Sequence, residues 1–366
     1  MKDTYFITGY PGFLASNLLQ QLIQDHQQHI DQIYLLVLPT LKEQALEELS
    51  RISSKCALNN KQFTLITGDI TKKQLHLDDK VNRVLQQSVT HVFHLAAIYD
   101  LAVPKNIAFT VNVNGTKNIN DWVITLSELK RYIYFSTAYV SGKREGRIFE
   151  HELSKGQLFR NHYEQTKYDA EILVQQIKNK VPTTIIRPGV VKGHSKTGET
   201  IKFDGLYFML NIFDKLRLFP IIPYFGEGTA EGNFVPSDYV LQATSYLSIH
   251  PNGEGKTYHL TDPKPYKMWE LQRMLSEHYL GKTPKGKIPI PVAKATLASS
   301  SIRKWLQIEP EALDYFTVHS SYDCSQAVTD LEGSGITCPD FKATIQPMIQ
   351  FYRKYKHDNS RQIKIN

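Results

Sequence analysis

The chain of 366 residues is 41% hydrophobic and 22% charged, a composition that is typical of a globular protein and excludes a disordered one. It has no run of about 18 apolar residues and no secretion signal in MKDTYFITGY, so we expect a cytoplasmic protein without an integral membrane segment. The net charge of +7 comes from dispersed lysines and arginines without a helix-turn-helix or zinc-finger pattern, so nucleic acid is not an expected partner.

Strands and helices alternate along the first half of the chain. Residues 4–7 form a β-branched and aromatic run that Thr8 and Gly9 end, and apolar residues then recur at helical spacing. Further apolar runs predict strands at 33–38, 63–67, 91–97, 132–137 and 183–188. Helices are predicted from Thr40, with Glu43 completing a capping box, and at 104–129 and 163–178.

This alternation predicts an α/β fold with a doubly wound parallel sheet of Rossmann type and right-handed crossovers. The pattern weakens after about residue 195, where proline and aromatic residues become dense. We therefore expect a sheet domain over 1–195, with 255–263 returning to the sheet, and a smaller, partly interleaved second lobe over 196–366.

The segment TGYPGFLA, residues 8–15, has the features of a dinucleotide-binding loop. Gly9 ends the strand in a tight turn, and Gly12 allows the backbone to approach a pyrophosphate that faces the positive end of the helix dipole. The third position of the motif requires only a small residue, so that the helix and the strand can pack closely, and Ala15 is small enough. The alternative is a plain turn between a strand and a helix.

A second glycine pattern, GHSKTGET at 193–200, nearly matches a P-loop. Glu199 stands where the phosphate-binding lysine would be, and its charge would repel phosphate. We interpret the segment as a mobile loop and reject a nucleotide triphosphatase.

Residues suited to acid–base chemistry follow the strand at 132–137. Tyr163 lies 26 residues after Thr137, and Lys167 lies four residues further, so the two share a face of the predicted helix. An ammonium beside Tyr163 would lower the pKa of the phenol, making Tyr163 a general acid or base. Thr137 can hydrogen-bond the same substrate oxygen, although an exposed helix pair would show the same spacing.

Together and in order, these motifs resemble those of extended short-chain dehydrogenases/reductases. The resemblance covers most of the chain and rests on TGYPGFLA (8–15), GDIT (68–71), HLAAIYDL (94–101), NVNGT (112–116), FSTAYVSG (135–142), YEQTK (163–167) and RPGVVKG (187–193). It implies an NAD(P)-binding domain with a Ser/Thr-Tyr-Lys centre. In that centre Tyr163 is the acid/base and Thr137 orients the carbonyl or hydroxyl. Lys167 lowers the pKa of Tyr163 and holds the nicotinamide ribose, and Asn112 is a structural and proton-relay residue.

The same resemblance implies a set of cofactor-binding residues. Asp69 and Ile70 fall where the adenine is contacted, and Ala96 and Ala97 fall where the chain passes the cofactor. The full set is Thr8, Gly9, Pro11, Gly12, Phe13, Leu14, Asp69, Ile70, Leu95, Ala96, Ala97, Ser136, Tyr163, Lys167, Pro188 and Val191.

The end of the second predicted strand bears on the choice of nucleotide. Its sequence, Val37-Leu38-Pro39-Thr40, offers no acid for the ribose 2′-hydroxyl of NAD and therefore no repulsion of the NADP phosphate. No arginine stands there, but Lys42 or Arg51 could supply positive charge. The sequence favours NADP, and NAD stays open.

A narrower resemblance is to the fatty acyl-CoA reductase and thioester reductase branch. It rests on GFL in the glycine loop, STAYVSG, RPGVVKGHSKTGE, FVPSDYV (234–240) and YDCSQAVTDLEGSGITCPDF (322–341). The resemblance implies NAD(P)(H)-dependent reduction of an acyl thioester or a lipophilic aldehyde or ketone. An acyl-CoA or acyl-carrier thioester would then be the small-molecule substrate of a monomer or homodimer.

Two other functions stay open: a nucleotide-sugar epimerase/dehydratase or hydroxysteroid-type dehydrogenase, and a non-catalytic NAD(P)-binding protein. An apolar pocket in the second lobe would favour a lipophilic carbonyl, and a polar pocket with arginines would favour a nucleotide sugar. Residues 203–213 could line such an apolar pocket or belong to an ordinary core. We expect 288–306 to form a packed amphipathic helix rather than a membrane contact.

No metal site is expected. Cys56, Cys324 and Cys338 are isolated and lack a C-x-x-C spacing, which argues against a zinc site or a disulfide framework. His91 and His94 are three apart on a predicted strand, so their side chains should point to opposite faces.

Overall fold

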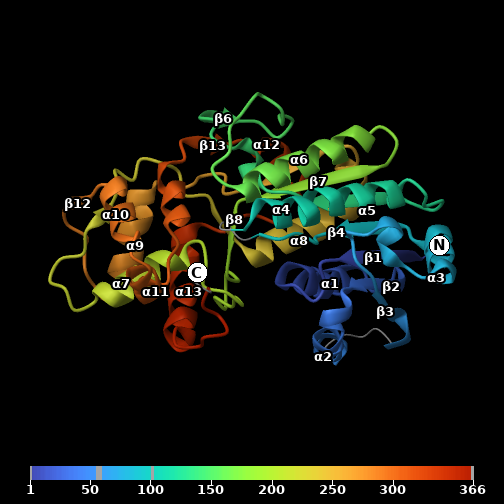
Figure 1. Cartoon of the computed structure of the whole chain (residues 1–366), viewed down its shortest axis with the longest axis horizontal. Helices are drawn as coiled ribbons and strands as arrows, with labels where there is room; N and C mark the ends of the chain where they lie inside the picture. Colours follow the sequence, from blue (N-terminus) through green and yellow to red (C-terminus); the bar gives the residue numbers. More distant parts are fainter. Residues whose placement is uncertain (1, 55–59, 100–102, 364–366) are drawn as a thin grey trace.

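The computed structural model describes residues 2–54, 60–99 and 103–363. Its centre is a seven-stranded sheet in the order β11-β7-β5-β4-β1-β2-β3, in which every neighbouring pair is parallel (Figure 1). The strands are β1 (Asp3–Thr8), β2 (Ile30–Val37), β3 (Phe63–Thr67), β4 (His91–His94), β5 (Arg131–Phe135), β7 (Thr183–Pro188) and β11 (Thr257–Leu260). The predicted doubly wound α/β fold is confirmed, and the strand order reverses between β1 and β4, where ligands bind in such sheets.

Helices cover both faces of this sheet. One layer contains α1 (Phe13–His26), α2 (Lys42–Ser53) and α8 (Ser237–Ile249), and the other contains α3 (Asp79–Ser88), α5 (Gly115–Val123) and α6 (His162–Ile177). The side chains of consecutive strand residues pack against opposite helix layers, because side chains alternate between the two faces of a strand. Phe6 packs in the layer of Trp122, and Ile7 packs in the layer of Leu18.

The start of α2 differs from its predicted form. A 3-10 turn, η1 (Pro39–Leu41), precedes the helix, so Leu41 rather than Thr40 occupies the N-cap position and no side chain caps it. The predicted capping box of Thr40 and Glu43 is therefore wrong. Pro39 accounts for this, because its fixed φ favours the first position of a tight turn.

The helix after β4 is shorter and less regular than predicted. It consists of α4 (Lys105–Ala108), a π-helical segment η4 (Phe109–Asn114) and α5, which ends at Val123 instead of residue 129. Strand β4 also ends three residues before the predicted limit of 97. The π-helical turn contains Asn112, and such turns are frequent at functional sites.

The second lobe has its own core, at the opposite end of the long axis from β3 (Figure 1). Its helices are α7 (Tyr207–Leu216), α9 (Met268–Leu280), α10 (Ile290–Thr296), α11 (Ser300–Leu306), the 3-10 helix η7 (Pro310–Thr317) and α13 (Phe341–Tyr355). The segment 288–306 thus forms two short helices instead of one. Residues 203 and 206–213 are buried in this core, and among them Ile212 also lines a cavity.

Short strand pairs lie outside the main sheet. Strand pairs are formed by β6 (Gly146–Ile148) with β13 (Ser320–Tyr322), β8 (Val190–Lys192) with β10 (Phe234–Pro236), and β9 (Tyr224–Phe225) with β12 (Lys287–Ile288). The pair of β9 with β12 belongs entirely to the second lobe. Helix α12 (Ser325–Asp330) follows β13. Helix α8 and strand β11 come from beyond residue 195 but belong to the layers of the sheet domain. The two lobes are therefore interleaved along the chain. A domain boundary at residue 195 remains our proposal.

Over the described ranges, no helix combines the length and apolar character that a membrane crossing needs. Cys324 and Cys338 are free thiols, and Cys56 lies outside the described residues.

Candidate cofactor and active site

The glycine loop has backbone geometry that requires its glycines. Gly9 has a φ of +87°, and a Cβ there would lie 2.8 Å from the amide nitrogen of Ala96. At Gly12 a Cβ would lie 2.6 Å from the carbonyl oxygen of Gly9. Gly12 is the N-cap of α1 and has no side chain to satisfy the first N–H groups of the helix. With the small Ala15 buried beneath it, this loop fits the phosphates of a dinucleotide.

A buried histidine fixes the glycine loop to the end of β4. The Thr8 hydroxyl forms a 2.8 Å hydrogen bond with Nδ1 of His94 and accepts one from the amide of Ala96 at 3.2 Å. Nε2 of His94 is 3.1 Å from the Thr116 hydroxyl. Burial lowers the pKa of His94 to about 3, so the ring is neutral. The Thr8 hydroxyl is therefore engaged in hydrogen bonds within the protein.

In the described ranges, no group of three metal-ligating side chains occurs.

Most of the predicted cofactor residues lie at or directly after the carboxyl ends of parallel strands and so along one edge of the sheet, whereas Tyr163 and Lys167 belong to α6. Pro11, Phe13 and Leu14 are partly exposed around the start of α1, as are Leu95 and Ala97 after β4. Pro188 ends β7 and is buried, and Val191 is partly exposed in β8.

The turn after β3 is rigidly built. Asp69 Oδ1 accepts a hydrogen bond from the amide of Thr71 at 2.8 Å, and the carbonyl of Ile70 accepts one from the Asn118 side chain at 2.8 Å. The Ile70 side chain packs against Gly115, where a Cβ would lie 2.7 Å from it. This turn brings the two predicted adenine-contacting residues to the same edge as the glycine loop.

The end of β2 bears no acidic side chain. Leu38 follows the strand and is 42% exposed, and Lys42 is exposed at the start of α2. Arg51 is already paired with Glu48 at 2.6 Å, so Lys42 is the better of the two predicted cations for a 2′-phosphate.

Tyr163 lies in the first turn of α6, close to Thr137. The N-cap Asn161 accepts a hydrogen bond from the amide of Glu164 at 2.9 Å and so fixes where the helix begins. Burial raises the pKa of Tyr163 to about 12, while its hydrogen bond with Thr137 lowers it and the charge of Glu164 raises it. At neutral pH Tyr163 is therefore a protonated phenol, which suits a proton donor.

This direction differs from the expected lowering by Lys167. The Lys167 ammonium donates to the carbonyl of Phe135 and lies 4.6 Å from the centre of the Tyr134 ring. Burial lowers the pKa of Lys167 to about 7, against the opposing effect of Glu171. The predicted lowering of the pKa of Tyr163 is therefore wrong, because burial dominates and the charge of Glu164 raises the pKa further. A direct effect of Lys167 on this pKa stays a prediction.

Asn112 joins the segment after β4 to helix α6. Its side chain accepts a hydrogen bond from the amide of Ile98 at 2.8 Å and donates to the carbonyl of the same residue at 3.0 Å. It also donates to the hydroxyl of Thr166, at 3.1 Å. Asn112 therefore has a structural role beside Tyr163 and Lys167, and its proton-relay role stays a prediction.

A buried ion pair behind this site was missed by the sequence analysis. Arg187 binds Glu171 at 2.6 Å, and their side chains are 1% and 0% exposed. Ser136 donates its hydroxyl proton to the same carboxylate, so this hydroxyl is engaged within the protein. Glu171 lies four residues after Lys167, a spacing that could have placed it on the same helix face.

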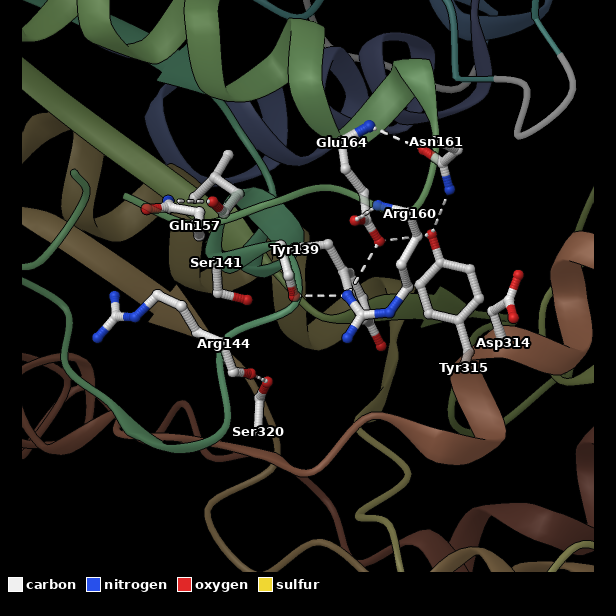
Figure 2. Close-up of polar contacts among 12 residues, drawn as sticks. Tyr139, Ser141, Arg144, Gln157, Arg160, Asn161, Glu164, Asp314, Tyr315 and Ser320 are labelled. Atoms are coloured by element: carbon white, nitrogen blue, oxygen red, sulfur yellow. Dashed lines mark hydrogen bonds and ion pairs between the residues drawn. The ribbon is translucent and has the colours of Figure 1, made fainter. Parts of the chain in front are cut away.

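A second missed cluster surrounds the start of α6. Figure 2 shows Tyr315 of η7 directed toward Asn161, Arg160 and Glu164. No local signal pointed to Tyr315, because it lies 151 residues from Glu164 in the sequence.

The P-loop-like segment forms a closed turn. The amide of Gly198 donates to the carbonyl of His194 at 2.8 Å, and the amide of His194 donates to the carbonyl of Glu199 at 3.0 Å. Ser195 is held by Asp238, and the turn packs on α13 at Pro347. No helix follows directly, so the segment lacks the structural context of a phosphate-binding loop.

The second lobe contains an apolar cavity of about 390 Å³. Among the described residues that line it, Lys287 alone is charged, and none of them is a predicted catalytic residue. Apolar residues of α7, β9, α10, α11 and η7 form most of the wall, among them Ile212, Leu216, Phe225, Val292, Trp305 and Leu313. The cavity can therefore accept a hydrocarbon group and offers few partners for a sugar diphosphate.

A doubly wound sheet with a glycine loop at its first crossover, and with Thr137, Tyr163 and Lys167 near the same edge, has the architecture of a Rossmann-type dinucleotide-binding protein. The NAD-binding family described as "Male sterility protein" matches residues 7–244. The chain belongs to this family.

Individual relatives share about a quarter of their aligned residues with the chain. A non-canonical nonribosomal peptide synthetase of Aspergillus campestris is 26% identical over 78% of the chain, and an aldehyde reductase of Aspergillus flavus is 25% identical over 72%. The chain spans 28% and 27% of the lengths of these two proteins. An alcohol-forming fatty acyl-CoA reductase of Simmondsia chinensis is 23% identical, over 80% of the chain and 74% of that protein.

Two solved structures illustrate the shared fold. The terminal R domain from the myxalamid biosynthetic pathway superposes with a TM-score of 0.81 at 24% identity, covering 98% of the chain and 92% of that domain. A UDP-glucuronic acid 4-epimerase from Bacillus cereus in complex with NAD gives a TM-score of 0.64 at 20% identity, covering 97% and 99%.

Proposed function

We propose that the protein uses NADPH to reduce an acyl thioester, or a lipophilic aldehyde or ketone, whose hydrocarbon part binds in the second lobe. We infer a lipophilic substrate from the apolar cavity of about 390 Å³, in which Lys287 is the one charged residue among the described lining residues. The similarity to an acyl-CoA reductase and an aldehyde reductase supports the same class of reaction.

The residues at the sheet edge have the chemistry to hold a dinucleotide. The glycine loop and the uncapped start of α1 would hold the pyrophosphate, Asp69 and Ile70 the adenine side, and Lys167 the nicotinamide ribose. When bound, the reduced nicotinamide supplies the hydride for the carbonyl carbon. Leu38 presents no charge against a 2′-phosphate and Lys42 offers one in favour, which supports NADPH over NADH.

Tyr163 and Thr137 act on the carbonyl oxygen. Thr137 orients the oxygen by a hydrogen bond, and the phenol of Tyr163 donates its proton as the C–H bond forms. With a thioester, the resulting hemithioacetal then loses its thiol: the C–S bond breaks and the hydroxyl proton leaves with the sulfur. The balance is thioester, NADPH and one proton to aldehyde, thiol and NADP⁺, and solvent returns the proton to Tyr163.

The test is a substrate panel followed by NADPH absorbance. We expect oxidation of NADPH with long-chain acyl-CoA or long-chain aldehydes and none with UDP-sugars. Conversion of a UDP-sugar without turnover of any lipophilic carbonyl would contradict the proposal and favour an epimerase or dehydratase.

Placing a carboxylate at the end of β2 should reverse the nucleotide preference. In Leu38→Asp the new charge repels the 2′-phosphate, so the ratio of kcat/KM for NADPH to that for NADH should fall by about tenfold or more, equivalent to about 1.4 kcal/mol. Leu218→Asp, which adds the same charge at an exposed position of the second lobe, is the control. An equal ratio in the wild type and Leu38→Asp would count against this nucleotide site.

Cofactor affinity should fall as the pH rises through about 7. The pKa of Lys167 is about 7 in the free protein, so the ammonium is present below that pH and lost above it. If only the ammonium form binds the ribose, Kd for NADPH rises by up to about tenfold between pH 6 and pH 8. Fluorescence titrations check this, with Lys167→Arg as the charged control. A flat profile in the wild type, or the same profile in both proteins, would refute the role of Lys167.

A further inference from the structure

The second lobe reaches into the first turn of the helix that carries Tyr163. The hydroxyl of Tyr315, from η7, donates to Oε1 of Glu164 at 3.0 Å and accepts from Nδ2 of Asn161 at 3.1 Å (Figure 2). Asn161 is the N-cap of α6, and Glu164 directly follows Tyr163. One side chain of the second lobe thus bonds to residues on both sides of Tyr163, namely Asn161 and Glu164.

Glu164 is a buried carboxylate whose partners are all supplied by the protein. It is 0% exposed, and its Oε2 accepts from the amide of Arg160 at 3.0 Å. The Arg160 guanidinium lies 3.5 Å from Oε1, and the positive end of the helix dipole also favours a carboxylate in this turn. Tyr315 therefore provides one of the few donors that make burial of this charge tolerable.

Tyr315 also contacts the segment that carries Thr137. Its ring packs edge-on against Tyr139, with centroids 5.0 Å apart and planes at 89°. Tyr139 lies two residues after Thr137, and its amide donates to the Thr137 hydroxyl oxygen at 3.3 Å. Tyr315 is thus in contact with both segments that present the proposed catalytic residues.

The helix that carries Tyr315 also contributes to the wall of the apolar cavity. Leu313, two residues earlier in η7, lines that cavity. Asp314 forms an ion pair with Lys294 of α10, the helix that supplies Val292 and Ala293 to the same wall. The short helix η7 therefore lies between the cavity and the first turn of α6.

We propose that Tyr315 is a positioning residue, which holds Tyr163 and Thr137 in their reactive arrangement from the second lobe through Glu164, Asn161 and Tyr139. The proposal rests on the proposed reductase function for its kinetic consequences. It assigns to the second lobe a direct part in ordering the catalytic centre in addition to binding the substrate.

The first test is Tyr315→Phe, which keeps the ring and removes the hydroxyl. We expect kcat to fall by about tenfold, because a catalytic group that is slightly misplaced loses rate rather than affinity. Kd for NADPH and KM for the carbonyl substrate should stay within about twofold. The matched control is Tyr168→Phe on the same helix, which loses a hydroxyl bond to Ser154 away from this cluster and should keep kcat. An unchanged kcat in Tyr315→Phe, or equal losses in both variants, would overturn the proposal.

A double-mutant cycle tests whether Tyr315 acts through Glu164. After Glu164→Gln, the further change Tyr315→Phe should cost less than half of its effect on log kcat in the wild type, because the two groups act as one unit. Additive losses would overturn the route through Glu164. Should Tyr315→Phe fail to fold, Glu164→Gln alone carries the test: an unchanged kcat in this variant would overturn the proposal.

Hydrogen exchange separates failure of this proposal from failure of the proposed function. In the Tyr315→Phe variant, the amide hydrogens of residues 161–167 should exchange with solvent several-fold faster than in the wild type. In Tyr168→Phe their exchange rates should be unchanged. This result does not depend on any substrate. A wild type without turnover of any carbonyl would refute the reductase proposal, whereas unchanged exchange in Tyr315→Phe would refute the positioning role.

Discussion

Tyr163→Phe is expected to lower kcat by about three orders of magnitude, within the range that removal of a general acid produces. The variant keeps the ring and loses the hydroxyl group, whose proton is retained at neutral pH because the pKa is raised to about 12. Kd for NADPH should change by less than about twofold, since we propose that the glycine loop, not Tyr163, holds the phosphates. Steady-state kinetics and fluorescence titration measure the two effects separately.

The control for this prediction is again Tyr168→Phe, which removes a phenol from α6 outside the site. It should retain kcat within about twofold. A Tyr163→Phe variant that keeps more than about a tenth of the wild-type kcat would show that another group, or water, protonates the product.

Glu171→Ala is expected to lower the free energy of unfolding by about 3–5 kcal/mol, because it leaves the buried guanidinium of Arg187 without its carboxylate. It also removes the acceptor of the Ser136 hydroxyl at the end of β5. Urea unfolding at neutral pH measures the loss.

Glu48→Ala is the matched control for this stability prediction. It breaks the more exposed ion pair with Arg51 and should cost no more than about 1 kcal/mol. Equal losses in the two variants would show that the Arg187–Glu171 pair contributes no more than a surface pair.

The parts of the fold that the sequence predicted depend on local patterns. Apolar runs locate the strands, and Gly9 marks the turn after β1, where a Cβ would collide with the backbone of Ala96 after β4. Parallel topology then places the ends of the strands at one edge, which is why Thr137 and Tyr163 could be assigned to one site without coordinates.

The errors come from effects that a local pattern does not encode. Pro39 starts a 3-10 turn that displaces the predicted cap at Thr40. The direction of the Tyr163 pKa depends on burial by distant segments, which the i, i+4 spacing with Lys167 does not reveal. The bond from Tyr315 to Glu164 joins residues 151 positions apart, so the contribution of the second lobe to the site required the folded chain.

We propose that a lipophilic acyl thioester, one of the substrates proposed above, is reduced with NADPH at Tyr163. The most direct measurement is the stoichiometry of one reaction: a long-chain acyl-CoA and NADPH with the wild type and with Tyr163→Phe, counting free thiol released against NADPH oxidised. We expect equal release of thiol and oxidation of NADPH when the product stops at the aldehyde, twice as much NADPH when it continues to the alcohol, and neither with Tyr163→Phe. Thiol release without oxidation of NADPH, or equal turnover by Tyr163→Phe, would contradict it.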